Sequence, residues 1–274
     1  MNAAPNKVDF AIAESSDVCS RAADGVAYSA NGSSAEVTWQ LPEETPIAIQ
    51  FNSEPYTVMM ATPADLRDFA IGISIAEGMI RDAGAIQGVL VMPVEGGIAV
   101  DIAVEDSALV KERLVRRAIE GRSGCGLCGV EDINSALRPL TPVRRDWAPS
   151  ADVIRKAAAA LHDQQPMNRV NRSVHAAAWV STAGDILLVR EDVGRHNALD
   201  KLIGAMHQAE FDASIGFALM TSRCSFELVQ KSVTAGIGAL VTVSAPTALA
   251  LDLAKSANLF LASLQRGEAV VFNA

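Results

Sequence analysis

The stretch Ala239-Leu-Val-Thr-Val-Ser244 is a short apolar run that lies between two amphipathic helical patterns, at 225–236 and 247–256. The same alternation continues on both sides, through an expected helix at 196–208 and expected strands at 214–221 and 259–264. Apolar strands that alternate with amphipathic helices are typical of a sheet covered by helices. The pattern predicts an α/β sandwich with a largely parallel sheet.

The earlier part of the chain has its own strand and helix patterns. Strands are expected at 46–51, 56–60, 89–92, 98–104, 174–180 and 186–189. Helices are expected at 63–77, 107–119, 131–137 and 150–162. Three prolines interrupt the pattern at 139–149, which we interpret as a linker. We therefore expect a disordered tail at 1–34, a smaller N-terminal α+β subdomain at 35–140 and an α/β subdomain at 141–274.

Bulk composition limits the function classes. Of 274 residues, 50% are hydrophobic, and the formal net charge is −9. Nucleic-acid binders are more often basic, so we expect no nucleic-acid partner. The N-terminus lacks a signal-peptide pattern, and no apolar run is long enough to span a bilayer. We expect a cytoplasmic protein, without membrane association and without a disulfide scaffold.

The most reactive stretch is Ser123-Gly-Cys-Gly-Leu-Cys-Gly-Val130, in which Cys125 and Cys128 are spaced by two residues among three glycines. Such a pair can be half of a zinc site, a redox pair or a sulfur carrier. A structural zinc site needs four ligands, and the sequence offers no second Cys or His pair. A thioredoxin-like pair would follow a strand directly, and no strand is expected directly before Cys125. Nearby Arg116, Arg117 and Arg122 would favour a nucleophilic thiolate.

Two polar stretches lie where an expected strand passes into an expected helix. The first, at 190–201, includes Arg195 and His196, and the second, at 221–227, includes Ser222 and Arg223. Ligand sites of α/β sheets lie at such strand ends, and hydroxyls with helix N–H groups bind phosphate. The alternative interpretation of both is an ordinary solvated helix start. Cys224 is expected to take no part, and no role follows from the sequence for Cys19.

Six segments together resemble the FdhD family of sulfur carriers that serve formate dehydrogenase. The cysteine loop and Arg190-Glu-Asp-Val-Gly-Arg-His-Asn-Ala-Leu-Asp-Lys201 carry most of the resemblance. The other matching segments are Met59–Asp65 with Glu77-Gly78, Val174–Ala177, Thr221–Glu227 and Val243–Ala250. The resemblance covers about residues 40–273.

The resemblance implies a cytidine deaminase-like three-layer sandwich, a homodimer and sulfurtransferase activity. A cysteine desulfurase would donate sulfur to Cys125 as a persulfide, with Cys128 as its partner in transfer. The acceptor would be the molybdenum (or tungsten) bis-molybdopterin guanine dinucleotide cofactor, before its insertion into formate dehydrogenase. No structural metal is implied. The resemblance also places the guanine-nucleotide end of the cofactor at a C-terminal turn, here Leu264, Gln265, Arg266, Gly267 and Glu268.

The sequence departs from the family pattern at this turn. It is one residue shorter than expected, and Glu268 stands where a second basic residue is common. The cytidine deaminase-like fold does not imply deaminase activity, because the chain has neither His-x-Glu nor Pro-Cys-x-x-Cys. Two other functions stay open: a cofactor-binding chaperone without sulfur chemistry, and a zinc-stabilised structural module.

Overall fold

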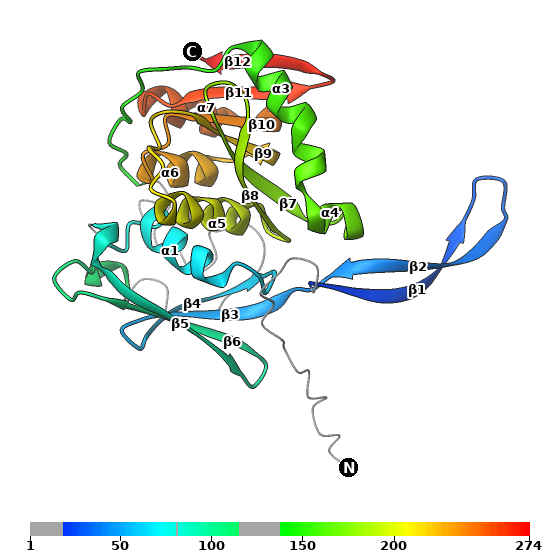
Figure 1. Cartoon of the computed structure of the whole chain (residues 1–274), viewed down its shortest axis with the longest axis horizontal. Coiled ribbons are helices and arrows are strands. Elements are labelled where there is room, and N and C mark those ends of the chain that lie inside the picture. The colour runs from blue at the N-terminus through cyan, green and yellow to red at the C-terminus, as the bar shows by residue number, and fades with distance from the viewer. Residues whose placement is uncertain (1–18, 81, 115–137) are drawn as a thin grey trace.

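A six-stranded mixed sheet forms the centre of the C-terminal half (Figure 1). The computed structural model describes residues 19–80, 82–114 and 138–274. The strand order is β12-β11-β10-β9-β7-β8, with β9, β10 and β11 parallel to one another. The strands are β7 His175–Val180, β8 Ile186–Asp192, β9 Phe217–Cys224, β10 Ala239–Pro246, β11 Phe260–Gln265 and β12 Glu268–Asn273.

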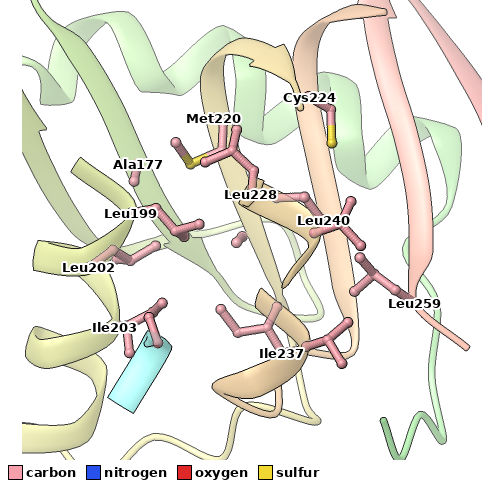
Figure 2. Close-up of a cluster of buried hydrophobic side chains, with 14 of the residues drawn as sticks. Ala177, Leu199, Leu202, Ile203, Met220, Cys224, Leu228, Ile237, Leu240 and Leu259 are labelled. Atoms are coloured by element: carbon pink, nitrogen blue, oxygen red, sulfur yellow. The ribbon is translucent and has the colours of Figure 1, made fainter. Parts of the chain in front are cut away.

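Alternate residues of these strands face two separate helical layers. One layer consists of α5 Arg195–Gln208, α6 Phe226–Thr234 and α7 Ala248–Ser256. In Figure 2, Leu199 and Leu202 of α5 lie beside Ala177 and Met220 of the sheet, in one buried cluster. The neighbouring strand residues face the opposite way, toward α3 Ala151–Leu161. The period of two that predicts a strand therefore also explains why helices cover both faces.

The N-terminal half has a second sheet, with the order β4-β3-β6-β5. Its strands are β3 Thr45–Phe51, β4 Glu54–Ala61, β5 Ile86–Val94 and β6 Gly97–Val104. The helix α1 Leu66–Ala76 packs on one face, where Phe69 and Ile73 meet Ile47 and Ile49. The remaining helical elements are η2 Ala83–Ala85, η3 Lys111–Arg113, η4 His162–Gln164 and α4 Pro166–Asn171.

The helices α1 and α5 join the two halves at very close range. A Cβ atom on Gly72 of α1 would lie 1.6 Å from the carbonyl oxygen of Asp200, and one on Gly204 of α5 would lie 1.9 Å from that of Asp68. Each glycine thus faces the backbone of the opposite helix, and no larger residue fits there.

The expectation of a tail over residues 1–34 is wrong where the structure describes that region. Strands β1 Ser20–Tyr28 and β2 Ser34–Pro42 form an antiparallel hairpin that projects from the body (Figure 1). Successive side chains of its strands point to opposite faces. Many of them are small Ala, Ser and Gly residues, so the apolar–polar alternation with a period of two is hard to see in the sequence. One face pairs Ala23 with Trp39, and on the other face the Thr38 hydroxyl donates to Asp24.

Three further predictions need correction, and two elements were missed. The large sheet is mixed rather than largely parallel, since β7–β8, β7–β9 and β11–β12 are antiparallel pairs. The helix expected at 63–77 begins only at Leu66, because Asp65 has a left-handed backbone (φ 52°). Residues 107–114 form a 3₁₀ turn and a bridge from Leu109 to Ile80, not a regular α-helix. The elements α4 and β12 were not predicted.

In 19–80, 82–114 and 138–274, no helix is long and apolar enough to cross a membrane.

Candidate functional site

The carboxyl ends of β8, β9, β10 and β11 lie at one edge of the large sheet. The chain continues from the first three strands into α5, α6 and α7, and from β11 into the turn at 266–267. The structure thus brings both polar stretches and the C-terminal turn to the same edge, which we call the strand-edge site. From β8 to β11 it spans four inter-strand spacings, about 19 Å. An extended ligand with several phosphates would fit such a length.

His196 lies in the first turn of α5, and its side chain reaches the start of α6. Its Nε2 lies 3.4 Å from the Ser225 hydroxyl and 3.7 Å from the Glu227 carboxylate. Burial lowers the pKa of His196, the positive charge of Arg195 adds to this, and Glu227 offsets it only in part. Burial acts to raise the pKa of Glu227, but hydrogen bonds from His196 and Ser225 outweigh it and the net shift is downward. The pair is therefore a neutral imidazole beside a carboxylate near neutral pH.

Arg195 and His175 lie at the same edge. The buried Nε of Arg195 has no hydrogen-bond partner among the residues that the structure describes. A buried donor without a partner is costly, so this atom is suited to an anionic ligand. Burial lowers the pKa of His175, and the charge of Arg195 lowers it further.

The stretch at 221–227 divides into structural and accessible residues. The Thr221 hydroxyl accepts a hydrogen bond from the Ala176 N–H at 2.8 Å, which joins β9 to β7. Ser222 is buried, and its hydroxyl donates to the carbonyl of Arg223 at 3.1 Å. The Arg223 residue itself is exposed. Of the predicted phosphate-binding residues here, Arg223 is the one that solvent reaches freely.

The C-terminal turn is a two-residue hairpin, because Gln265 pairs with Glu268. Arg266 and Gly267 both have positive φ, 52° and 84°, as expected for a type I′ turn. Leu264 is buried and packs in the core cluster with Phe217 and Val241. Gln265, Arg266, Gly267 and Glu268 are exposed. Their contact with a nucleotide stays a prediction, and a contact through the Leu264 side chain would require it to leave the core.

Cys125 and Cys128 lie outside the described residues, so their assigned roles stay predictions. The other two cysteines are buried thiols. Burial raises the pKa of Cys19 to about 11 and that of Cys224 to about 12. Neither is a thiolate near pH 7, so neither is suited to be a nucleophile.

Part of the stretch at 190–201 is structural rather than ligand-binding. The Lys201 ammonium is fully buried and lies 2.7 Å from Asp192. Asp192 also accepts hydrogen bonds from the Thr62 N–H and the Asn197 amide. In the sequence of α5, apolar residues such as Ala198 and Leu202 lie on both sides of Lys201. They were the available signal that this part of the stretch is buried.

The lowered pKa values of His175 and His196 predict how stability depends on pH. The unfolded chain binds protons near pH 6.5, whereas the folded state binds them only at lower pH. Both histidines therefore stabilise the fold above about pH 6.5 and lose this contribution as the pH falls. Between pH 7.5 and 5.5, the free energy of unfolding from urea titrations should fall more steeply for the unmodified protein than for His175→Gln/His196→Gln. The difference between the two slopes is at most about 1.4 kcal/mol per pH unit for each histidine. Equal slopes would contradict the prediction.

Residues 42–273 match the model of the FdhD/NarQ family. The chain belongs to the FdhD/NarQ family. A relative from Cupriavidus necator, named sulfur carrier protein FdhD, is 44% identical over 232 residues, which cover 85% of this chain and 81% of the relative. A relative of the same name from Xanthomonas euvesicatoria pv. vesicatoria is 46% identical over 237 residues, covering 86% and 84%.

A solved structure has a similar fold. It comes from Desulfotalea psychrophila and is described as a formate dehydrogenase accessory protein. It is 24% identical to this chain, with a TM-score of 0.73, and the match covers 93% of this chain and 97% of the other. The mixed α/β architecture is thus shared with this solved structure.

Proposed function

We propose that this chain is a cytoplasmic sulfur carrier with sulfurtransferase activity. It would accept sulfur from a cysteine desulfurase on Cys125 and pass it to the molybdenum or tungsten bis-molybdopterin guanine dinucleotide cofactor, for insertion into formate dehydrogenase. The names of relatives that are 44% and 46% identical over most of the chain support the role of carrier. The observation that carries the acceptor half is the strand-edge site, with its unpartnered Arg195 Nε among the described residues.

The cysteine inventory supports the cysteine loop as the place of sulfur chemistry. Cys19 and Cys224 are buried, with raised pKa values. The Cys125 thiolate would attack the outer sulfur of the donor persulfide. The sulfur–sulfur bond of the donor breaks, the donor leaves as a thiol, and Cys125 then holds a persulfide.

Release of that sulfur is a second exchange. The Cys128 thiol would attack the inner sulfur of the Cys125 persulfide. A Cys125–Cys128 disulfide forms, and hydrosulfide leaves toward the acceptor. A cellular dithiol then reduces the disulfide and restores both thiols. The alternative is direct transfer of the outer sulfur from Cys125, with Cys128 assisting.

The acceptor would lie along the strand-edge site as a bound substrate. Its phosphates would meet Arg223, Arg195 and the N-terminal N–H groups of α6 and α7, whereas Ser222 stays a buried structural residue. The exposed turn residues Gln265, Arg266, Gly267 and Glu268 would face its guanine end. His196, held neutral beside Glu227, offers a hydrogen bond to a polar group of the ligand. A homodimer is proposed as well, on the family resemblance alone.

Guanosine diphosphate is the probe for this site. We expect it to bind the unmodified protein, and we expect Arg223→Ala to raise its Kd about tenfold, because one charge-assisted hydrogen bond is lost. Arg155→Ala is the matched control, since Arg155 is an arginine of α3 on the other face, paired with Asp152. Its Kd should stay unchanged. Isothermal titration calorimetry measures all three, and equal Kd values for Arg223→Ala and the unmodified protein would remove Arg223 from the site.

A further inference from the structure

Two arginines meet at the C-terminal end of α1. Arg113 and Arg138 both donate a hydrogen bond to the backbone carbonyl of Glu77, Arg138 at 2.8 Å. Arg138 also reaches the carbonyl of Ala76 at 3.4 Å. In the sequence, these two arginines flank residues 115–137, which include Cys125 and Cys128. The chain therefore leaves for the cysteine-bearing segment and returns from it at one point of the described structure.

The end of α1 is built to receive guanidinium groups. The last carbonyls of a helix lack partners within the helix and lie at its negative end. Gly78 follows with a positive φ of 62°, and a Cβ atom there would lie 2.9 Å from Nη1 of Arg113. The positive φ favours glycine here, and a Cβ atom would also displace the Arg113 guanidinium.

A buried charge cluster fixes this point to both halves of the protein. The Glu77 carboxylate lies 2.8 Å from the Lys231 ammonium and 3.5 Å from Arg138. Lys231 also pairs with Asp200 of α5 at 2.8 Å. Burial acts to lower the pKa of Lys231, but Asp200 and Glu77 outweigh it and raise that pKa, so the lysine stays charged. The cluster therefore joins α1, α5 and α6.

The same helix α6 also carries part of the strand-edge site. Glu227, the partner of His196, precedes Lys231 by four residues, about 6 Å along the helix axis. The Gln230 side chain, one residue before Lys231, accepts a hydrogen bond from the Arg138 N–H at 2.8 Å. The anchored ends of the segment thus lie about one helical turn from the proposed acceptor site.

We propose that Arg113 and Arg138 are positioning residues for sulfur transfer. They hold the two ends of the cysteine-bearing segment beside the strand-edge site, through the carbonyl of Glu77. This inference rests on the proposed function. Without their side chains, the backbone N–H at position 138 still has Gln230 as its acceptor, so the outer limit of release is set by Val110, which bonds to Met79, and Val143, which bonds to Ala257. At that limit, the length of chain between anchors would grow from 25 residues (113 to 138) to 33 (110 to 143).

A longer tether alone has a small effect, and that makes the proposal testable. Effective concentration falls roughly as the −3/2 power of tether length, so even the full eight added residues predict a loss of less than about twofold. Loss of orientation costs far more, since a displacement of about 1 Å can change a rate about 100-fold. Positioning by the two arginines therefore predicts a loss of about tenfold or more.

The experiment measures the effective concentration of the Cys125 thiol at the strand-edge site. A reporter thiol is introduced by the substitution Arg223→Cys, together with Cys128→Ser, in the full chain. The equilibrium of the disulfide between Cys125 and this reporter thiol against glutathione then gives the effective concentration. We expect Arg113→Gln/Arg138→Gln to lower it about tenfold, and Arg138→Lys to keep more of it than Arg138→Gln. Arg145→Gln is the matched control, because Arg145 lies in the same connecting segment but bonds to Ala274, and it should change nothing.

Two outcomes would overturn the proposal. A fall of less than about twofold in the double variant would match mere lengthening of the tether and would overturn the proposal. An equal fall in Arg145→Gln would overturn it too. If the double variant does not fold, each single variant is measured under the same criterion. Failure of the proposed function itself shows separately, as absence of labelled sulfur on Cys125 in the unmodified protein.

Discussion

A Gly204→Ala variant is expected to lose at least about 3 kcal/mol of unfolding free energy. Alanine normally stabilises a helix interior by up to about 1 kcal/mol over glycine, so the predicted sign is the reverse of the intrinsic one. The reason is the crossing of α1 and α5, where the added Cβ would lie 1.9 Å from the carbonyl oxygen of Asp68. Both contacting atoms belong to backbone or Cβ, so no rotamer change relieves the clash and the helices must separate.

Gly72→Ala should behave in the same way, because its Cβ would lie 1.6 Å from the carbonyl oxygen of Asp200. Gly88→Ala is the control, since no atom lies within 4 Å of the Cβ position there. Urea unfolding measures all three. If Gly204→Ala were as stable as Gly88→Ala, the close helix crossing would be incorrect.

Loss of the buried Lys201 charge is the second large effect. Lys201→Met should cost about 3–5 kcal/mol, because it leaves the buried Asp192 carboxylate without its cation. It also removes the hydrogen bond from Lys201 to the carbonyl of Thr62 at 3.0 Å, which joins α5 to the segment before α1. Lys255→Met, at an exposed position of α7, is the matched control and should stay within about 0.5 kcal/mol.

A double-mutant cycle with Asp192→Asn separates the ion pair from packing. Asparagine has nearly the same shape as aspartate but no charge, and it keeps one of the two oxygens that accept from the Thr62 N–H (Oδ2) and the Gly194 N–H (Oδ1). The double variant should therefore be more stable than the sum of the two single losses predicts. Strictly additive losses would show that the pair does not stabilise the fold through its charges.

The alternation of strands and helices after residue 174 was predictable from the sequence. The inner strands β7, β9, β10 and β11 are apolar on both faces because helices cover both sides of the sheet. The β1–β2 hairpin was not predictable in the same way. It projects from the body, and small residues such as Ala23, Gly25 and Ala27 give its apolar face little signal.

The candidate site was predictable in place but not in detail. Strand-to-helix junctions indicated the correct edge of the sheet for Arg195, His196, Ser222 and Arg223. Which of the polar residues there are exposed and which are buried was hidden, because burial depends on distant partners. Asp192 is buried by contacts with Thr62, which precedes it by 130 residues. Composition alone therefore counted Asp192 and Lys201 among the polar residues of a ligand site.

Sulfur loading tests the central claim most directly. The protein is incubated with a cysteine desulfurase and ³⁵S-labelled cysteine, and label bound to the protein is counted after separation without reductant. We expect close to one labelled sulfur on each unmodified chain, none on Cys125→Ala, and full labelling of Cys224→Ala, which lacks a thiol of the described core. Equal label on Cys125→Ala and the unmodified protein would contradict the role of Cys125. No label on any of them would contradict the sulfur carrier and favour a chaperone that only binds the cofactor.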